Sequence, residues 1–374
     1  MSASPTLIMS TVLSVTLLHA VSRAEELTLT QIADAWNKTQ AAVESGRISF
    51  KSSRWAAKGS LGSGEEGEEV VPVQDRTLES ESKIVFKGSM LRCEVSGEEW
   101  DFRRGSFIKR RRIYTWDSEK ATDFNGDSKF PDAFIFDVNR ELAGHSLVAL
   151  QHAFRMNDPD WYVFQPERWQ LTSGESTYDG LRCRNIELTA EAMGRNPIKA
   201  TYSVCPDRNF SIVNYEAVDQ RDGKPTFKYS AQHQFDNELQ LWIPHSWTTS
   251  LHGKSGVFDT VSSTIDRWEL NVPVADSEFV IDLPVNTFVS DTRAIGTPEQ
   301  DFVLRANEEQ RFVTRDELVR GATRDEIIQT ETGMAGLRTE TSSSIWASPR
   351  TYLMGLGILA LVVAGYVMIR KRRE

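Results

Sequence analysis

The chain has 374 residues, of which 40% are hydrophobic and 26% charged, and its formal net charge is −10. This composition is that of a globular protein, and it excludes a disordered or collagen-like chain. The acidic balance also argues against a nucleic-acid-binding protein, which needs a basic face to neutralise phosphates.

The amino-terminal segment is typical of a secretory signal peptide. Residues 7–18 form an uncharged apolar run, and the next six residues, HAVSRA, lead into an acidic start. With Ser22 and Ala24 at the small-residue positions, we expect cleavage after Ala24 and therefore a signal peptide over residues 1–24. No Lys or Arg precedes the apolar run, which leaves an uncleaved anchor or a buried helix as the alternative.

The first expected element of the mature chain is an amphipathic helix over residues 29–45. Thr28 or Thr30 is expected to cap its start, and Gly46 to end it. Its apolar residues recur at helical spacing and form one stripe. The residues of this stripe are Ile32, Ala33, Trp36 and Val43.

A strand is expected over residues 47–55, and a flexible acidic loop follows it. Residues 58–81 are rich in Gly, Ser and Glu and lack an apolar periodicity. Such a composition favours a mobile loop over a functional acid cluster.

Residues 82–270 are dominated by short segments in which apolar and polar residues alternate, as in half-buried strands. Turn signals such as Asp179–Gly180 and Asp222–Gly223 separate them, and together they predict an antiparallel meander. One helix, over residues 140–154, interrupts the strands. The predicted fold class is therefore α+β, with helices covering a curved antiparallel sheet. The clearest period-two segment is Phe227, Tyr229, Ala231, His233 and Phe235.

The chain has three cysteines, too few for a disulfide framework. Cys183 and Cys205 flank a predicted hairpin and could be cross-strand neighbours joined by a disulfide, with Cys93 left over. The alternative is that they are buried free thiols that behave as small hydrophobic residues.

The character of the chain changes after residue 281. Residues 283–289 are predicted to be the last extended segment, and residues 292–351 a charged helical segment with a Thr/Ser-rich spacer. The tetrapeptide Thr-Arg-Asp-Glu occurs at 314–317 and again at 323–326. It is either a short repeat or a coincidence of charged helix caps.

The carboxyl-terminal end predicts a transmembrane helix over residues 352–369, which are uncharged and long enough to span a bilayer. The tail, residues 370–374, begins with four basic residues, and such a cluster prefers the cytoplasmic side. We therefore expect a single-pass protein of a bacterial inner membrane, with its ectodomain in the periplasm. A buried helix and a sorting signal removed after export are the alternatives.

Several segments together resemble the LolA/LolB lipoprotein carriers and the related RseB-type periplasmic domains. They are ADAWNKTQAAVESGRISF, TYSVCPDRNFSIVNYE, LWIPHSW and FVIDLPVNTFVSD. The resemblance implies a half-barrel domain over residues 25–291: an incomplete antiparallel β-barrel covered by helices. In the carriers the apolar interior of this barrel holds the acyl chains of lipoproteins. A chain tethered by a carboxyl-terminal span could not shuttle between membranes as those carriers do.

Candidate ligand-binding residues come from the aromatic side chains, which either line a cavity or pack in the core. The cavity-lining candidates are Trp36, Phe227, Tyr229, Phe235 and Trp242. A basic segment over residues 102–112 either docks to anionic groups or forms a charged strand edge.

No catalytic signature occurs in the sequence. It lacks a Gly-rich phosphate-binding loop, a Gly-x-Ser-x-Gly elbow and metal-ligand spacing, so no catalytic residue, metal site or cofactor is expected. We therefore predict a non-enzymatic, membrane-tethered domain that binds a lipid, an acyl chain or a lipoprotein. The alternative is an envelope sensor or scaffold that acts through a membrane protein partner, and a hollow interior would favour the first over the second.

Overall fold

The structure of the chain is a computed structural model. It describes residues 27–61, 71–101, 106–117, 119–126, 131–136, 146–154, 165–188, 198–253, 255–294, 300–306, 309–314, 317, 319, 322 and 324–329. The expected signal peptide (1–24), transmembrane segment (352–369) and basic tail (370–374) lie outside these residues. Among the described residues, no helix is long and apolar enough to cross a membrane.

The described chain is mostly β, with one large sheet and few helices, which corrects the α+β expectation. The strands of its first part are β1 (Ser45–Ala56), β2 (Arg76–Lys87), β3 (Met90–Asp101), β4 (Ser106–Trp116), β5 (Ala121–Asn125) and β6 (Asp132–Phe136). Those of the middle part are β7 (Trp169–Tyr178), β8 (Leu181–Leu188), β9 (Ile198–Cys205), β10 (Ser211–Asp219), β11 (Lys224–Asp236), β12 (Leu241–Gly253) and β13 (Gly256–Leu270). Three short strands end the series: β14 (Phe288–Asp291), β15 (Asp301–Leu304) and β16 (Gln310–Phe312).

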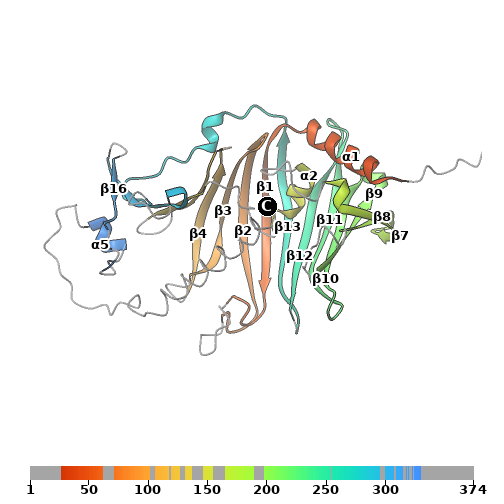
Figure 1. The fold of residues 1–374 in the computed structure, drawn as a ribbon, viewed down its shortest axis with the longest axis horizontal. Coiled ribbons are helices and arrows are strands. Elements are labelled where there is room, and N and C mark those ends of the chain that lie inside the picture. The colour runs from red at the N-terminus through yellow and green to blue at the C-terminus, as the bar shows by residue number, and fades with distance from the viewer. Residues whose placement is uncertain are drawn as a thin grey trace, which may run out of the picture.

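The sixteen strands form one open, curved sheet in the order β16-β15-β14-β6-β5-β4-β3-β2-β1-β13-β12-β11-β10-β9-β8-β7 (Figure 1). Strands β1–β6 and β7–β13 are two antiparallel meanders, as the sequence predicted, and pairing of β1 with β13 joins them. Bulges interrupt the ladders, for example between Ser49 and Phe50 and between Gln232 and His233. Bulges increase the local twist and bend a strand, which helps the sheet to curve.

Helix α1 (Leu29–Ala42) lies along one end of the sheet and buries the predicted apolar stripe. Thr28 is the cap, and it forms a reciprocal capping box with Gln31. Gly46 does not end the helix as expected, because it belongs to β1. A Cβ atom there would lie 2.8 Å from the Phe86 ring and 2.9 Å from Leu270 Cδ2, so a glycine allows these two side chains to pack across the strand.

Helix α2 (Val148–Phe154) lies against one face of β10 and β12 and contacts α1. It begins at Val148, within the range 140–154 expected to be helical, and residues 146–147 before it form a turn. Its apolar side chains Leu150 and Phe154 are buried in the main core, where the Phe154 ring stacks on Phe86. The side chain of Trp247 ties this segment to the sheet, because its Nε1 donates to the carbonyl oxygen of Ser146 at 3.0 Å.

Two expectations outside the central sheet need correction. The acidic loop expected over residues 58–81 gives way to strand β2 at Arg76. The segment 283–289 is not the last extended one, because β15 and β16 follow it, and the charged region contains these strands before the short helix α5 (Arg324–Gln329).

The first Thr-Arg-Asp-Glu tetrapeptide has the hydrogen bonds of a capping box. Thr314 and Glu317 hydrogen-bond each other reciprocally, from the Thr314 backbone N–H to the Glu317 carboxylate and from the Glu317 N–H to Thr314 Oγ1. The second tetrapeptide overlaps the start of α5 at Arg324.

Candidate functional site

The concave face of the sheet has two chemically different halves. Along β1 the inward side chains change from Ile48 and Phe50 near α1 to Ser52 and Arg54 further along the strand. Across the sheet, Ile48 is in register with Ile84 on β2 and Phe50 with Ile265 on β13, whereas Arg54 lies between Leu78 and Val261. The half beneath the helices is therefore mainly apolar, and the opposite half, called the charged half below, combines charged side chains with apolar ones.

The apolar half is filled by side chains. Phe50, Tyr202 and Tyr229 are among its largest fully buried side chains. The void next to α1 and α2 has a volume of about 20 Å³, close to the space that one water needs. It is lined by Trp36, Thr39, Ala149, His152, Ala153, Asn209, Ser211, Ile212, His233 and Trp242. This void is too small for an acyl chain.

The five aromatic residues proposed from the sequence all belong to this half. Trp36 and Tyr229 are buried, and Trp36 Nε1 donates to the carbonyl oxygen of Phe210 at 2.7 Å. Phe227 packs against the main core, and Phe235 pairs with Trp242, their ring centroids 5.3 Å apart. Of the five, only Trp36 and Trp242 border the small void. Their role as ligand contacts stays a prediction.

A buried histidine sits at the centre of this half. The His152 ring on α2 lies 5.1 Å from the Tyr229 ring and 5.6 Å from the Tyr202 ring. Burial, and secondarily the neighbouring His233, lowers the pKa of His152 to about 3. Burial also raises the pKa of Tyr229, whose buried hydroxyl has no hydrogen-bond partner among the described residues. Both side chains are therefore neutral at physiological pH.

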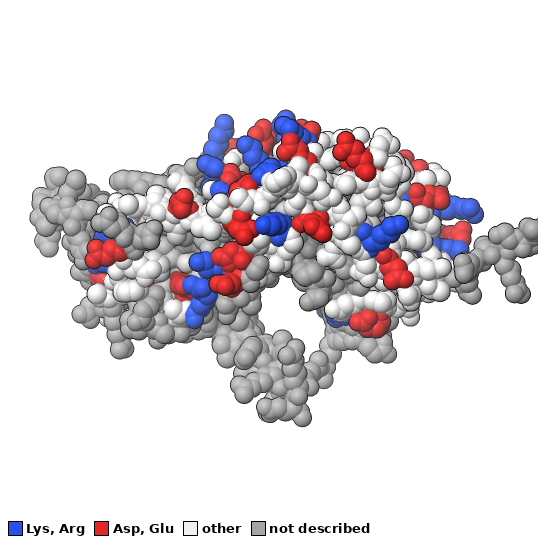
Figure 2. Space-filling view, turned by 90° about the horizontal axis from the view of Figure 1, so that it is seen from above, with Lys and Arg blue, Asp and Glu red and all other residues white. Residues whose placement is uncertain are grey.

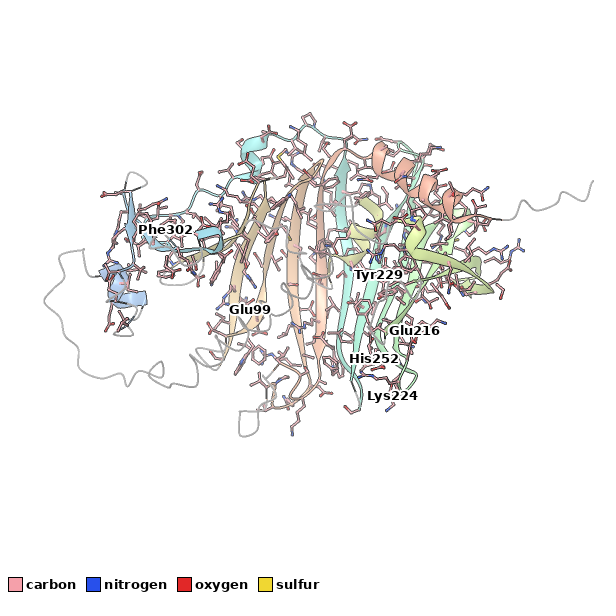
Figure 3. The ribbon with its side chains drawn as sticks, in the orientation of Figure 1. Glu99, Glu216, Lys224, Tyr229, His252 and Phe302 are labelled. Carbon is pink, nitrogen blue, oxygen red and sulfur yellow. The ribbon has the colours of Figure 1, made fainter. Side chains whose placement is uncertain are left out.

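The charged half contains a pocket of about 630 Å³ over the inner face of β1–β4. This volume is within the range of pockets that hold small molecules. Four of its side chains are apolar, and the rest are polar, charged or small. The lining residues are Arg54, Ser60, Leu61, Leu78, Ser80, Val95, Gly97, Glu98, Glu99, Trp100, Arg110 and Arg112. Figure 3 shows Glu99 near the lower ends of β3 and β4, on the other side of the sheet's centre from Tyr229 (Figure 3).

Arginine–carboxylate pairs hold the charged side chains of this pocket. Arg54 donates from Nε to Asp259 Oδ2 at 2.9 Å, and the Asp259 side chain is only 4% exposed. Arg110 contacts Glu99 through Nη1 and donates from Nη2 to Asp101 at 2.8 Å. Each buried or half-buried charge is thus compensated by a partner on a neighbouring strand or on the same hairpin.

Two more pairs complete this set. Arg112 on β4 is paired with Asp123 on β5 through Nε and Nη2. Arg76 donates from Nη2 to Glu98 Oε2 at 2.8 Å, and its guanidinium carbon lies 3.7 Å from the centroid of the Phe107 ring. Four guanidinium groups therefore meet five carboxylates around the pocket.

The predicted basic segment is partly a lining of this pocket. Strand β4 lies between β3 and β5, so it is not the charged sheet edge considered from the sequence. Arg110 and Arg112 face the pocket, and Arg111 is paired with Glu94 at 2.7 Å. Seen from above, acidic and basic side chains are interspersed over the described surface (Figure 2), so this view offers no broad basic field.

Cys183 and Cys205 are brought together on β8 and β9. They share a small buried cluster with Val213, and both are free thiols in this structure, as is Cys93. Burial, and secondarily Cys205, raises the pKa of Cys183 to about 11. This arrangement matches the alternative of buried free thiols. Within the described residues, no group of three or more His, Cys, Asp or Glu side chains could hold a metal ion.

Comparison with known proteins gives matches among solved structures alone. No family model matches the chain, and no curated protein matches it. A LolA superfamily protein from Nitrosomonas europaea is similar at 14% identity and a TM-score of 0.40, over 68% of this chain and 99% of that one. A putative outer-membrane lipoprotein-sorting domain from Vibrio parahaemolyticus is similar at 9% identity and a TM-score of 0.35, over 67% and 97%. A DUF1329 family protein from Desulfovibrio piger has 11% identity and a TM-score of 0.34, over 67% and 97%.

All of these TM-scores are below 0.5.

Proposed function

We propose that the chain is a non-enzymatic binding domain that holds a lipid, an acyl chain or the lipid part of a lipoprotein on its concave face. The observation that supports this most directly is the pocket of about 630 Å³ over β1–β4. Its lining combines apolar and charged side chains, which is the chemistry of an amphipathic ligand.

The apolar part of the ligand would lie against four residues of the pocket. Leu61, Leu78, Val95 and Trp100 line it. Burying each methylene group of an acyl chain contributes about 0.8 kcal/mol. A short stretch of acyl chain therefore offsets much of the free-energy cost of association.

Small inward side chains on the strands that form the floor keep this pocket open. Ser80 on β2 is in register with Gly97 on β3, and a Cβ atom at Gly97 would lie 2.6 Å from Ser80 Cβ. A larger side chain at either position would enter the space or push the two strands apart. We infer that the ligand occupies the space above Ser80 and Gly97.

The experiment that tests this proposal fills the pocket with a side chain. The delipidated full chain should take up a fluorescent fatty acid, and Ser80→Trp should abolish this uptake. Ser262→Trp is the matched control, because Ser262 is exposed on β13 and hydrogen-bonds Thr248 rather than facing the pocket. Equal uptake by both variants, with both still folded by circular dichroism, would contradict the proposed site.

We further propose that the domain is tethered to a bacterial inner membrane and faces the periplasm. The support is the apolar segment 352–369 with its basic tail, together with the apolar run at residues 7–18. Protease added outside the inner membrane should degrade the ectodomain and leave a short membrane fragment. Protection of the ectodomain, with digestion of the tail, would overturn this orientation.

The second candidate function is an envelope sensor or scaffold that acts through a membrane partner. The filled core beneath α1 and α2 favours it, because no acyl chain fits there. Crosslinking from residues 299–331 in intact membranes should then recover a membrane protein. Crosslinking that recovers the chain alone would count against this candidate.

A further inference from the structure

Two cysteines lie opposite each other on neighbouring strands near one edge of the sheet. Strands β8 and β9 pair antiparallel, with Arg184 opposite Val204. The next pair in this register is Cys183 and Cys205, and the two side chains pack together with Val213. Opposite residues of an antiparallel pair have Cα atoms about 4.5–5.5 Å apart, which lies within the range of about 4.4–6.8 Å that a disulfide bond spans.

The two thiols also share one face of the sheet. Val204 belongs to the main core, so its neighbours Ser203 and Cys205 point to the other face of β9. On that face Ser203 Oγ donates to Asn185 Oδ1 at 2.9 Å, which shows that the side chains of opposite residues meet there. The pKa of Cys183 is raised by burial, then by the charge of Cys205, and then by a hydrogen bond between the two thiols. The two sulfur atoms are therefore within reach of each other.

The third cysteine lies in a different part of the fold. Cys93 on β3 is opposite Ile84 of β2 and Tyr114 of β4, and it belongs to the main core. In the sheet, β2, β1, β13, β12, β11 and β10 lie between β3 and β9. Cys183 and Cys205 therefore pair with each other without competition from Cys93.

We propose that Cys183 and Cys205 form an intramolecular disulfide bond, and that the oxidant is itself a disulfide, in a protein or in a small molecule such as oxidised glutathione. One cysteine thiolate attacks a sulfur atom of the oxidant, which forms a mixed disulfide and releases one thiol. The other cysteine thiolate then attacks the cysteine sulfur of the mixed disulfide, which closes the Cys183–Cys205 bond and releases the second thiol. The two cysteines lose two protons and two electrons, which end in the two released thiols.

The burial of the pair determines when the bond forms. Cys183 and Cys205 are 1% and 0% exposed, and Tyr178 and Leu181 pack against them. Thiols that are covered in this way react slowly, because the oxidant has no access to them. The exchange therefore takes place while the chain folds, before these side chains close over the pair. This inference does not depend on lipid binding.

The bond should stabilise one edge of the sheet. It joins the start of β8 to the end of β9, next to β7, which is the last strand in the order of the described sheet. Closing a loop of about 20 residues, here from residue 183 to residue 205, removes conformational freedom from the unfolded chain. We expect the midpoint of thermal unfolding to be about 5–10 °C higher in the oxidised chain than in the reduced chain.

The test counts the free thiols of the full chain after refolding. The chain, in detergent, is reduced and unfolded in urea, and is then refolded with a mixture of reduced and oxidised glutathione. After an acid quench, a maleimide of known mass labels every free thiol in urea. Of the three cysteines, Cys93 alone should be labelled, whereas all three should be labelled in a chain reduced before labelling. Peptide mapping by mass spectrometry should find the peptides of Cys183 and Cys205 joined.

Two variants control for the effect of losing a buried thiol. Cys93→Ala is the matched control, since it removes a thiol of the main core and leaves the pair intact. It should keep the disulfide, together with the difference in unfolding midpoint between its oxidised and reduced forms. Cys205→Ala should lose this difference. Each comparison is between two redox forms of one chain, so the destabilisation caused by the substitution itself cancels.

Several outcomes would overturn the proposal. They are labels on all three cysteines after refolding, glutathione attached to Cys183 or Cys205, and a bond from either of them to Cys93 or to a second chain. An oxidised chain that unfolds at the same temperature as the reduced chain, or at a lower one, would show that the paired strands do not accommodate the bond. Rapid oxidation of the native reduced chain would overturn its formation during folding.

Discussion

Acid should destabilise this protein through one histidine in particular. His152 on α2 is 7% exposed, and its pKa is lowered to about 3, by burial first and then by His233. In the unfolded chain the pKa of a histidine is about 6.5. Because the pKa in the folded state is the lower one, the unfolded chain binds more protons between these values. The free energy of unfolding therefore falls as the pH falls from about 6.5 toward 3.

The size of this effect follows from the width of the pH interval. A pH of 5 lies about 1.5 units below the pKa of a histidine in the unfolded chain, so the unfolded chain binds this proton while the folded chain does not. This difference lowers the free energy of unfolding by about 2 kcal/mol. His233 has a pKa of about 3 for the same main reason, but it is only half-buried, so its share should be smaller. Urea unfolding followed by tryptophan fluorescence at pH 7.5 and pH 5 measures the difference.

The comparison that isolates His152 uses His152→Gln, which does not titrate in this range. The wild-type chain should lose about 2 kcal/mol more than the variant between the two pH values, because carboxylate effects are common to both. Equal losses in the two proteins would refute the assignment of a neutral buried His152.

Three further predictions concern the site and its surroundings. Arg54→Met should lower the free energy of unfolding, measured by urea titration, by about 2 kcal/mol, because it leaves the buried Asp259 unpaired. Adding Asp259→Leu should recover most of this loss. A double variant as unstable as the single one would contradict this reasoning. Gly97→Val should cost about 1–3 kcal/mol by forcing β2 and β3 apart, and an unchanged midpoint would contradict the close approach. A thiol reagent should react slowly with Cys93 and Cys183 in the reduced native chain and quickly with them in urea. The reason is that burial raises the pKa of Cys93 to about 12 and that of Cys183 to about 11. Rapid labelling of the native chain would refute the burial of these thiols.

The elements that the sequence predicted well are those with strong local periodicity. The stripe of Ile32 and Trp36 marks α1, and Thr28 caps it as expected. The period-two segment from Phe227 to Phe235 is on β11, with Tyr229 and Ala231 buried inside. In both cases the spacing of apolar residues within one short segment is enough to predict the element.

The start of β2 was missed because Leu78 is the one hydrophobic residue among its first inward positions. Ser80 and Ser82 occupy places where an apolar residue would have revealed the alternation, and Glu79 and Glu81 beside them suggested a loop. Serine is small, and at Ser80 this leaves space in the pocket. The feature that hid the strand is therefore also a feature of the site.

The pocket could be predicted only in part, because its contacts join distant strands. Arg110 and Arg112 were noticed as part of a basic segment, yet their acidic partners could not be assigned from sequence order. Arg54 and Asp259 are 205 residues apart, and the pairing of β1 with β13 brings them together. Knowledge of that strand pair would have been needed to find the site.

The most direct test of the central claim is to map where an acyl chain lies on the full chain. A fatty acid with a photoreactive diazirine is bound, activated by light, and located by mass spectrometry of the labelled peptides. The pocket over β1–β4 predicts labels on the peptides that contain Leu78, Val95 and Trp100, and loss of these labels in Ser80→Trp. Labels confined to β11 and β12 near Phe227 and Trp242, or spread evenly over the surface, would contradict it.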